Sequence, residues 1–563
     1  MENPAENSVQ EFLRARDFLL CHRQDYETAY REFLWPALDR FNWALDYFDR
    51  MADGNPRPAL RILRQDEANT ISFAEMSDRS NRLANYLRSI GVRRSDTILI
   101  MLGNEAALWL ATLAAIKLGA IIIPTSYLIS ENELADRMVR GQVTHVITRP
   151  AQVHKFSGFR ATFTGICVGE APGWFPFDDY ESASPLFFPS GETRAQDPLF
   201  LYFTSGTTAQ PKLVMHSHVS YPVGSLSTMY WLGCQPGDLH FNISSPGWAK
   251  HAWSSFFAPW NAEACVVAAD LPRFSAKAIL QILDENAVTS LCAPPTVWRM
   301  LVQEDFASCR TQLREVVSAG EPLNPEIIER VKTAWGLVIR DGYGQTETTA
   351  QIANTPGQRV ESGSMGKPLP GFRIRILDEK GHDSCEGELA VALDPPPVGL
   401  MLGYLQRDGS VAFPQTAAYR TGDLAAVDAE GRVTFIGRTD DVFKASDYRI
   451  SPFELESMLL EHPSVAEAAV VPAPHALRTS VPKAFIRLAE GCLPDKASAL
   501  QIFQHTRLRT APFKRVRRLQ FCDLPKTTSG KIIRAELRRQ EGKQQGERQE
   551  NEFWESDFPE LQQ

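Results

Sequence analysis

Residues 97–124 read TILIMLGNEAALWLATLAAIKLGAIIIP. The run begins with an apolar strand, Thr97–Met101, continues as a helix, Glu105–Leu118, that Gly119 ends, and closes with a second apolar strand, Ala120–Pro124. Two buried strands joined by a helix form a βαβ unit, in which the strands run parallel. This stretch therefore predicts a parallel sheet covered by helices.

The segments on either side repeat this alternation. A helix is predicted at Phe73–Ser89, ended by Gly91, and strands are predicted at His145–Thr148, Leu199–Thr204 and Val316–Ala319. Alternating strands and helices indicate an α/β fold. We expect a large N-terminal domain built on helix-covered, mostly parallel sheets.

The composition and the predicted secondary structure of the sequence change near Gly437. A turn-rich β region, Val411–Ile436, precedes it, and the charged connector GRTDD (437–441) leads into a segment with its own helix signal. Ser451, Pro452 and Glu454 fit the N-cap, N1 and N3 positions of a capping box. We predict a large domain at 1–437, a small α+β domain at 438–541 and an acidic, Gln-rich tail at 542–563.

Net charge, cysteine pattern and the lengths of the apolar runs exclude several classes of protein. The 563 residues carry 59 Lys and Arg against 68 Asp and Glu, a net charge of −9, so nucleic acid would be repelled overall. The nine cysteines are scattered without a C-x-x-C pair, which indicates reduced thiols and a cytoplasmic protein. The sequence shows no secretory leader and no apolar run of about 18 residues, so we expect no transmembrane segment. It leaves the oligomeric state open.

A strand, a hydroxyl-rich loop and a second strand follow one another at residues 199–215, LFLYFTSGTTAQPKLVM. Hydroxyl groups, backbone N–H groups and a lysine suit phosphate oxygens. We therefore predict a polyphosphate cradle at Thr204, Ser205, Gly206, Thr207, Thr208 and Lys212. Pro211 and the strand after it exclude a Walker A loop, which requires a helix there. The alternative is an ordinary Ser/Thr turn in a hairpin.

The stretch YFTSGTTAQPK, residues 202–212, resembles the signature loop of the AMP-forming adenylating enzymes, with Ala209 in place of the usual Gly. This family includes acyl-CoA synthetases, luciferases and peptide-synthetase adenylation domains. The resemblance implies that ATP is a substrate. It also implies a distorted β-barrel beside the large sheets and a small mobile C-terminal domain.

Two further segments resemble the nucleotide site of this family. In DGYGQTE, residues 341–347, Tyr343 is expected to pack on adenine, Thr346 to contact the α-phosphate and Glu347 to hold Mg²⁺. A dinucleotide fingerprint is excluded, because Glu347 stands where the third glycine would be. The resemblance adds to the nucleotide-binding set the neighbours Asp341, Gly342, Gly344 and Gln345, and Gly320, Glu321 and Pro322 of the adenine-flanking GEPL segment.

The region around the predicted domain boundary resembles three more family motifs. Asp423 of YRTGD is expected to accept hydrogen bonds from the ribose hydroxyls. Arg438 of GRTDD is expected to reach the nucleotide, and Asp440 to act as the hinge between domains. By the same resemblance Arg449 pairs with phosphate. The CoA path is expected at Ser446, Asp447 and Tyr448, where Asp447 replaces a Gly common in the family.

The segment PKTTSGKI, residues 525–532, resembles the C-terminal signature of the family and implies that Lys531 is catalytic. In the implied reaction a carboxylate attacks the α-phosphorus of ATP and pyrophosphate leaves. Thr204, Lys212, Glu347 and Lys531 stabilise the charge. The small domain then rotates, and the thiol of CoA takes the acyl group.

The acyl pocket is expected at SPGWAKHAW, residues 245–253, with Trp248, Lys250 and His251 as lining residues. Together with FNWALDY, residues 41–47, this segment looks most like the medium-chain acyl-CoA synthetase branch. A short-to-medium-chain carboxylic acid, straight or branched, is the expected substrate. Two alternatives stay open: a ligase that loads a carrier protein, and a catalytically silent member that binds nucleotide or acyl ligands. No carrier domain follows the small domain, which favours CoA.

Overall fold

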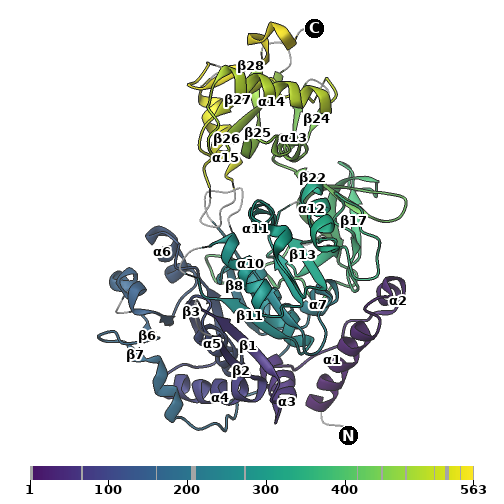
Figure 1. Ribbon diagram of the computed structural model, residues 1–563. Coiled ribbons are helices and arrows are strands. Elements are labelled where there is room, and N and C mark those ends of the chain that lie inside the picture. Colours follow the sequence, from purple (N-terminus) through teal and green to yellow (C-terminus); the bar gives the residue numbers. More distant parts are fainter. Residues whose placement is uncertain are drawn as a thin grey trace. The chain divides into compact units, whose positions relative to one another are not determined.

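The computed structural model of the protein describes residues 4–64, 68–159, 162–204, 211–271, 274–321, 323–414, 416–445, 448–475, 479–512, 514–526, 532–544 and 547–561. The chain divides into two compact units. The first comprises Met1–Ile374 and Ala392–Tyr419, and the second comprises Arg375–Val391 and Arg420–Gln563. Figure 1 labels many of their helices and strands.

The predicted βαβ unit lies at the centre of the first sheet. Strand β3 (Thr97–Met101) is buried along its whole length and pairs in parallel with β4 (Ile121–Pro124). Helix α5 (Ala106–Leu118) connects them, and Gly119 ends it at φ 70°. This confirms the prediction, because only a residue without a side chain adopts this conformation at no steric cost.

The two strands that flank the hydroxyl-rich loop in sequence belong to the same sheet. In the described residues its order is β20 (Val411–Ala412), β19 (Gly403–Leu405), β9 (Lys212–Ser217), β8 (Pro198–Thr204), β4, β3, β5 (His145–Thr148), β6 (Thr164–Cys167) and β7 (Phe175–Pro176). The strands from β8 to β7 are parallel. On the other side of β8, the pairs β8–β9, β9–β19 and β19–β20 are each antiparallel. Helices α4 (Phe73–Ser89), α6 (Glu131–Arg140), η2 (Pro150–Phe159) and η3 (Phe177–Ser182) belong to this half of the unit.

A second mostly parallel sheet carries the remaining predicted site segments of the first unit. Its order is β16 (Lys367–Pro368), β15 (Ala350–Ala353), β14 (Arg340–Gly344), β13 (Glu315–Ala319), β12 (Ser290–Ala293), β10 (Leu239–Asn242), β11 (Cys265–Ala269), β1 (Pro58–Leu63) and β2 (Ala68–Ser72). The strands from β14 to β1 are parallel.

Helices cover both faces of this second sheet. One face packs against α10 (Ala276–Glu285), α11 (Pro295–Leu301), η5 (Phe306–Ser308) and α12 (Pro325–Trp335) around an apolar core that includes the fully buried Trp298. The opposite face packs against α7 (Ser225–Leu232) and the continuous run of α8 (Ala249–Ala252), the π-helix η4 (Trp253–Phe257) and α9 (Ala258–Asn261). The predicted architecture of helix-covered, mostly parallel sheets is confirmed.

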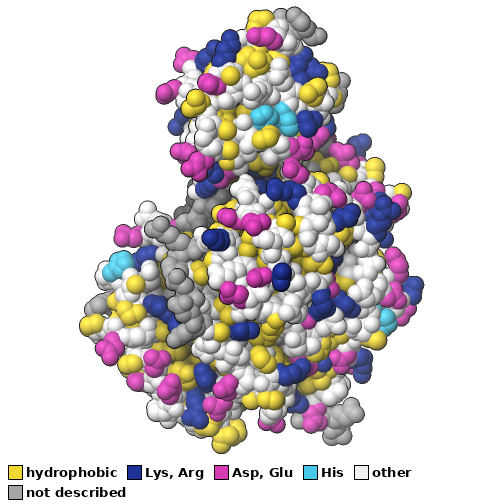
Figure 2. Space-filling view, viewed as in Figure 1, with side chains coloured by type: hydrophobic (Ala, Val, Ile, Leu, Met, Phe, Trp, Pro, Cys, Tyr) yellow, Lys and Arg dark blue, Asp and Glu magenta, His cyan; other side chains and the backbone are white. Residues whose placement is uncertain are grey.

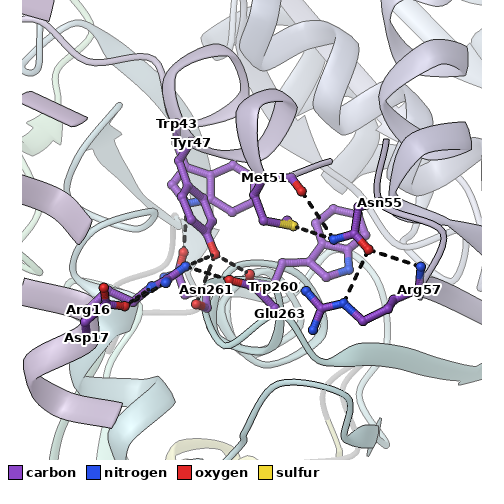
Figure 3. Close-up of polar contacts among 10 residues, drawn as sticks. All are labelled: Arg16, Asp17, Trp43, Tyr47, Met51, Asn55, Arg57, Trp260, Asn261 and Glu263. Atoms are coloured by element: carbon purple, nitrogen blue, oxygen red, sulfur yellow. Dashed lines mark hydrogen bonds and ion pairs between the residues drawn. The ribbon is translucent and has the colours of Figure 1, made fainter. Parts of the chain in front are cut away.

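An N-terminal arm fastens the end of this helical run. The arm consists of α1 (Pro4–Cys21), α2 (Tyr26–Glu32), the π-helix η1 (Trp43–Phe48) and α3 (Asp49–Ala52). Figure 3 shows Tyr47 of η1 pointing at the last turn of α9, where its hydroxyl donates to the carbonyl of Trp260 at 2.9 Å. Trp43 donates to the Asn261 side chain at 2.8 Å, and Arg16 pairs with Glu263 at 3.0 Å. Residues far apart in sequence thereby fix one end of the α8–η4–α9 run.

The described residues of the second unit form three sheets. The turn-rich β region contributes to a four-stranded sheet of β17 (Ile374–Leu377), β18 (Glu386–Ala392), β21 (Ala418–Val427) and β22 (Val433–Arg438). A hairpin of β23 (Phe443–Ala445) and β24 (Tyr448–Ile450) follows it. The last sheet has the order β25 (Val465–His475), β26 (Thr479–Leu488), β27 (Arg518–Phe521) and β28 (Glu552–Trp554), together with α13 (Pro452–Leu460), α14 (Lys496–Arg509) and α15 (Arg534–Lys543).

The compact second unit and the predicted small domain have different boundaries. The four-stranded sheet, which precedes residue 438, groups with the C-terminal elements. The boundary at 437/438 stays a prediction about which segment moves. Helix α13 begins with Ser451 as N-cap, whose hydroxyl accepts from the N–H of Glu454 at 3.1 Å, as predicted. The Glu454 carboxylate pairs with Lys514 at 2.7 Å, because a full opposite charge attracts it more strongly than a backbone N–H does.

The acidic tail contributes to this last sheet. Strand β28 pairs antiparallel with β27, and Phe558 is fully buried in the core around Phe503. Two short 3₁₀ helices, η6 (Glu555–Asp557) and η7 (Pro559–Leu561), follow β28. The aromatic residues of the tail therefore use the core of the adjoining sheet and helices, which compensates for the polar composition around them.

No helix in the described ranges is both long and apolar enough to cross a membrane. On the face shown in Figure 2, blue Lys and Arg side chains alternate with magenta Asp and Glu side chains, so neither sign dominates that face. The expectation that the chain does not bind nucleic acid stays a prediction.

Candidate functional site

The predicted phosphate loop lies in sequence between two neighbouring strands of the first sheet, β8 and β9. Thr204 ends β8 and Lys212 begins β9, and the two residues face each other in the antiparallel pair. Arg140 of α6 donates to the Pro211 carbonyl at 2.9 Å, which fixes the strand where the loop returns. Ser205, Gly206, Thr207 and Thr208 lie outside the described residues. The two predicted strands on either side of this segment are confirmed.

Tyr404 brings Lys212 and Glu347 together, although the two belong to different sheets. The Lys212 Nζ lies 4.9 Å from the centroid of the Tyr404 ring, within reach of a cation–π interaction. The Tyr404 hydroxyl donates to Glu347 Oε1 at 2.9 Å. Tyr404 reaches this position because β19 pairs with β9, where Tyr404 faces Val214. No motif in the sequence marks Tyr404, since a tyrosine in a three-residue strand carries no local signal.

The segment after β14 is held by its backbone. The carbonyl of Thr346 accepts a hydrogen bond from the Tyr221 hydroxyl at 2.6 Å, and a ring nitrogen of His216 lies 2.7 Å from it. Burial lowers the pKa of His216 to about 3, so the imidazole is neutral at physiological pH. The Gln345 side chain accepts from the Tyr419 hydroxyl at 3.0 Å. These contacts leave Thr346 and Glu347 in fixed places beside Tyr343 and Gly344.

Asp341 is a buried carboxyl group at the centre of β14. Burial raises its pKa to about 8, although the Gly342 N–H donates to Oδ1 at 3.0 Å and Lys250 lies nearby. The group is therefore protonated at neutral pH and can donate as well as accept. The next residue must be glycine, because a Cβ on Gly342 would lie 2.5 Å from the ring of Trp231.

The adenine-flanking segment follows β13. Gly320 has φ +110°, a conformation that glycine adopts readily, and Glu321 lies 3.8 Å from Arg299 of α11. Pro322 lies outside the described residues. Because β13 and β14 are parallel neighbours, Gly320 and Gly342–Glu347 follow the carboxyl ends of adjacent strands. Ligands of α/β sheets bind at such ends.

The predicted acyl segment reaches the same strand ends. Lys250 Nζ donates to the carbonyl of Ala319, the last residue of β13, at 3.3 Å. Trp248 is half-buried at the N-cap of α8. His251 is buried against Trp109 of α5, with ring centroids 5.6 Å apart, and burial lowers its pKa to about 3. The structure therefore brings Lys250 to the nucleotide segments and gives His251 an apolar neighbour.

The predicted ribose and hinge residues adjoin in the second unit. Asp423 of β21 and Arg438 of β22 face each other in the strand pair, with Arg438 Nη1 3.4 Å from Asp423 Oδ1. The same guanidinium lies 3.5 Å from Asp440. Only 4% of Asp423 is exposed, so its charge depends on this arginine for compensation.

Helix α15 holds the residues that follow the predicted hinge. Arg538 donates to the carbonyl of Asp440 and pairs with Asp441 Oδ1 at 2.7 Å. Arg534 lies 3.8 Å from the other oxygen of Asp441 and donates to Glu456 at 2.8 Å. Burial nevertheless raises the pKa of Asp441, although both arginines oppose the shift. We call Arg534 and Arg538, together with the hinge residues Asp440 and Asp441 that they contact, the hinge clamp.

Several predicted site residues are not described. Ser446, Asp447 and Lys531 lie outside the described residues, and the side chains of Tyr448 and Arg449 lie outside them too. Their roles stay predictions.

Glu347 is the candidate magnesium ligand. In the described ranges no group of three or more His, Cys, Asp or Glu residues could hold a metal ion. A single carboxylate suits Mg²⁺, which usually binds one or two carboxylates and completes its octahedron with water and substrate phosphates. Glu347 is partly exposed, and Tyr404 contacts both Glu347 and Lys212. Glu347 therefore lies near the lysine of the phosphate loop and fits this requirement.

Similarity to known proteins extends over almost the whole chain. The family model "AMP-binding enzyme" matches residues 48–405, and "AMP-binding enzyme C-terminal domain" matches residues 454–531. The 4-hydroxybutyrate–CoA ligase 1 of Metallosphaera sedula is 40% identical over 97% of this chain and 99% of its own length. The mitochondrial acyl-coenzyme A synthetase ACSM3 of Mus musculus is 36% identical over 92% of this chain and 93% of its own.

A solved structure shares the fold. The anthranilate CoA ligase AuaEII in complex with anthranoyl-AMP has a TM-score of 0.81 and 27% identity, covering 89% of this chain and 98% of its own. The matched regions contain the phosphate loop, the β14 segment and the C-terminal lysine segment. This protein therefore belongs to the AMP-binding enzyme family, the AMP-forming adenylating enzymes, as the motifs predicted.

Proposed function

We propose that this protein is an AMP-forming acid–CoA ligase. It activates a carboxylic acid with ATP to an acyl-adenylate and pyrophosphate, and transfers the acyl group to CoA. The contact set of Lys212, Tyr404 and Glu347 carries the proposal, because it gathers a cation, a hydroxyl and a carboxylate beside the phosphate loop. Full-length similarity to relatives named as CoA ligases and acyl-CoA synthetases supports the reaction type.

The first step is a displacement at the α-phosphorus. An oxygen of the substrate carboxylate forms a bond to phosphorus, and the bond to the pyrophosphate oxygen breaks. The carboxylate is already an anion, so no general base is required. Thr204, Lys212 and the loop between them are proposed to hold the leaving pyrophosphate, and Lys531 to stabilise charge between carboxylate and α-phosphate.

The nucleotide is proposed to bind at the carboxyl ends of β13 and β14. Gly320 and Glu321 flank the adenine, Tyr343 packs on it, and Thr346 donates to the α-phosphate. Asp423 is proposed to accept hydrogen bonds from the ribose hydroxyls, and Arg438 and Arg449 to contact the nucleotide. Mg²⁺, held by Glu347 and the phosphates, would neutralise charge on the leaving group.

In the second step the CoA sulfur attacks the carbonyl carbon, and the bond to the AMP oxygen breaks. The thiol releases its proton to water, and AMP leaves with the oxygen of the broken bond. Asp440 is proposed to absorb the backbone rotation that exchanges Lys531 for the CoA path at Ser446, Asp447 and Tyr448.

We infer a short-to-medium-chain acid, straight or branched, as the substrate. Trp248 and Lys250 precede η4 at the strand ends where the acyl-adenylate would form. His251 completes the predicted pocket set, although it packs on Trp109. A cytoplasmic location is also proposed. All nine cysteines are free, and burial raises the pKa of Cys265 to about 12 and of Cys309 to about 11. Such thiols are structural rather than reactive.

One assay tests the proposal against its two alternatives. AMP release is measured for a panel of carboxylic acids with ATP and Mg²⁺, with and without CoA. Acid-dependent AMP release that requires CoA and yields the acyl-CoA supports the ligase. Adenylate formation that CoA does not discharge indicates a carrier-protein acceptor, and nucleotide binding without pyrophosphate release indicates a silent member.

A further inference from the structure

Two buried tryptophans beneath the nucleotide segment have no hydrogen-bond acceptor. The indole nitrogens of Trp231 and Trp253 are screened from solvent and have no partner in the described part of the chain. Trp231 is 0% and Trp253 5% exposed, and their ring centroids lie 6.3 Å apart. Buried indole N–H groups are normally paired, and these two donors are available to an acceptor on a bound molecule.

The pair lies directly next to the residues of the proposed reaction. Trp231, near the end of α7, packs so closely on β14 that a Cβ on Gly342 would come within 2.5 Å of its ring. Trp253 and Ser254 follow Lys250 by three and four residues, which places them on one face of the helical run. Lys250 reaches the end of β13 at 3.3 Å. Of the two indoles, that of Trp231 therefore lies beside Gly342 of β14, and that of Trp253 lies within about one helical turn of Lys250.

The local backbone is unusual at this point. Trp253 begins the π-helix η4, and π-helical turns inside α-helices frequently occur at functional sites. Ser255 of η4 is fixed by two bonds, its carbonyl to Trp109 Nε1 at 2.8 Å and its hydroxyl to Asn242 Nδ2 at 2.7 Å. The Ser254 hydroxyl, by contrast, is buried without a partner in the described chain.

The N-terminal arm prevents this segment from turning to satisfy its own donors. At the far end of the run, Tyr47 and Trp43 bond to Trp260 and Asn261, as Figure 3 shows. The run is thus held at the strand ends, at Ser255 and at its last turn. Trp253 keeps its position, and its N–H stays available to a ligand.

We propose that Trp231 and Trp253 select carboxylic acids whose chain carries a neutral oxygen, a hydroxyl or keto group, over unsubstituted acids of equal length. The indole N–H groups donate to that oxygen, and the Ser254 hydroxyl can pair with a hydroxyl substrate as donor or acceptor. Burying a second carboxylate beside these neutral donors costs more than burying a neutral oxygen, so dicarboxylic acids are poorer substrates. This inference rests on the proposed ligase function and specifies its substrate class.

The test compares two acids of nearly equal size. In 4-hydroxybutanoate a hydroxyl replaces the terminal methyl of pentanoate, so the ratio of their kcat/KM values for AMP release reports the polar contact. We expect the unaltered protein to prefer 4-hydroxybutanoate by about tenfold or more. Trp253→Phe and Trp231→Phe keep an aromatic ring and remove the donor. Each should reduce the preference for 4-hydroxybutanoate several-fold.

A matched variant controls for the loss of an indole. Trp335→Phe in α12 removes an N–H that donates to Phe306 on the opposite face of the sheet, and it should leave the preference unchanged. Unfolding temperatures of all variants confirm that they fold. Equal use of both acids, or a preference that persists in both Trp231→Phe and Trp253→Phe, would overturn the inference while AMP release upholds the ligase.

Calorimetric binding of both acids, with a non-hydrolysable ATP analogue present, separates the two claims. If no acid gives AMP but 4-hydroxybutanoate binds more tightly than pentanoate, and Trp253→Phe removes the difference, the ligase proposal fails and the tryptophan site stands. If neither acid shows a tryptophan-dependent difference in binding or turnover, the tryptophan site fails.

Discussion

The Tyr404 hydroxyl lies 2.9 Å from Glu347 Oε1, and the same ring carries the Lys212 ammonium 4.9 Å from its centroid. One side chain therefore orients both the proposed magnesium ligand and the lysine of the phosphate loop. Two sheets meet at this contact, since Tyr404 lies on β19 and Glu347 follows β14. A hydrogen bond to a carboxylate is stronger than a hydrogen bond between two neutral groups.

Replacing the tyrosine tests that contact. Tyr404→Phe keeps the ring beneath Lys212 and removes the bond to Glu347, so we expect acid-dependent pyrophosphate exchange to fall about tenfold, with a higher KM for MgATP. Tyr86→Phe is the control, because it removes a 2.7 Å bond to the Pro176 carbonyl remote from the site. Unchanged exchange in Tyr404→Phe would remove Tyr404 from the site.

The C-terminal lysine should act in one half-reaction only. We expect Lys531→Ala to lower acid-dependent pyrophosphate exchange by at least about a hundredfold, because charge on the α-phosphate loses its cation. Thioester formation from supplied acyl-adenylate should persist. Exchange is followed with labelled pyrophosphate, and acyl-CoA by chromatography. Retained exchange would contradict the role given to Lys531.

The hinge clamp should affect the balance of the two half-reactions. Arg538→Met removes the bonds to the Asp440 carbonyl and to Asp441, so the backbone at Asp440 can rotate more easily. In single-turnover experiments we expect the rates of adenylation and thioester formation to shift in opposite directions. Arg548→Met removes a 2.7 Å pair with Asp557 elsewhere in the unit and serves as control. An equal change in both steps would show that the clamp is only structural.

Buried histidines should make the first unit labile to acid. Burial lowers the pKa of His216, His218 and His251 to about 3 and of His240 to about 4. An unfolded histidine has a pKa near about 6.5, so between about pH 6.5 and 4 the unfolded chain binds protons that the native one does not. Stability therefore falls as pH falls, by about 1.4 kcal/mol per pH unit for each histidine.

The pH dependence of the free energy of unfolding can be tested at one of these histidines. His218→Gln removes one such titration, so the free energy of unfolding from urea titrations between pH 4 and 6.5 should depend less steeply on pH. His154→Gln, at an exposed position, is the control. An identical pH dependence in His218→Gln and the unaltered protein would contradict the prediction.

The tail should stabilise the second unit. Phe558 is fully buried against Phe503, so Phe558→Ala should lower the free energy of unfolding by about 3–5 kcal/mol. Leu493→Ala, at a side chain that is 68% exposed, should change it little. Denaturant titration monitored by circular dichroism measures both. A small loss for Phe558→Ala would mean that the tail does not stabilise the unit.

The sequence alone determined the local elements and the chemistry of the motifs. The strand at Thr97–Met101 and the helix at Phe73–Ser89 have the predicted bounds, because hydrophobic period and glycine ends are local signals. The types of group at Lys212, Glu347 and Asp423 also follow from adjacent residues. The family followed from these motifs in their order along the chain.

The tertiary structure decided which groups meet. Tyr404 and Glu347 are 57 residues apart, and Tyr419 and Gln345 are 74 apart. Sheet pairing brings them together, and no local pattern encodes it. The unpaired indoles of Trp231 and Trp253 became visible only when burial and every neighbouring acceptor were known. A sequence shows which donors exist, but only the packed chain shows which of them are left for a substrate.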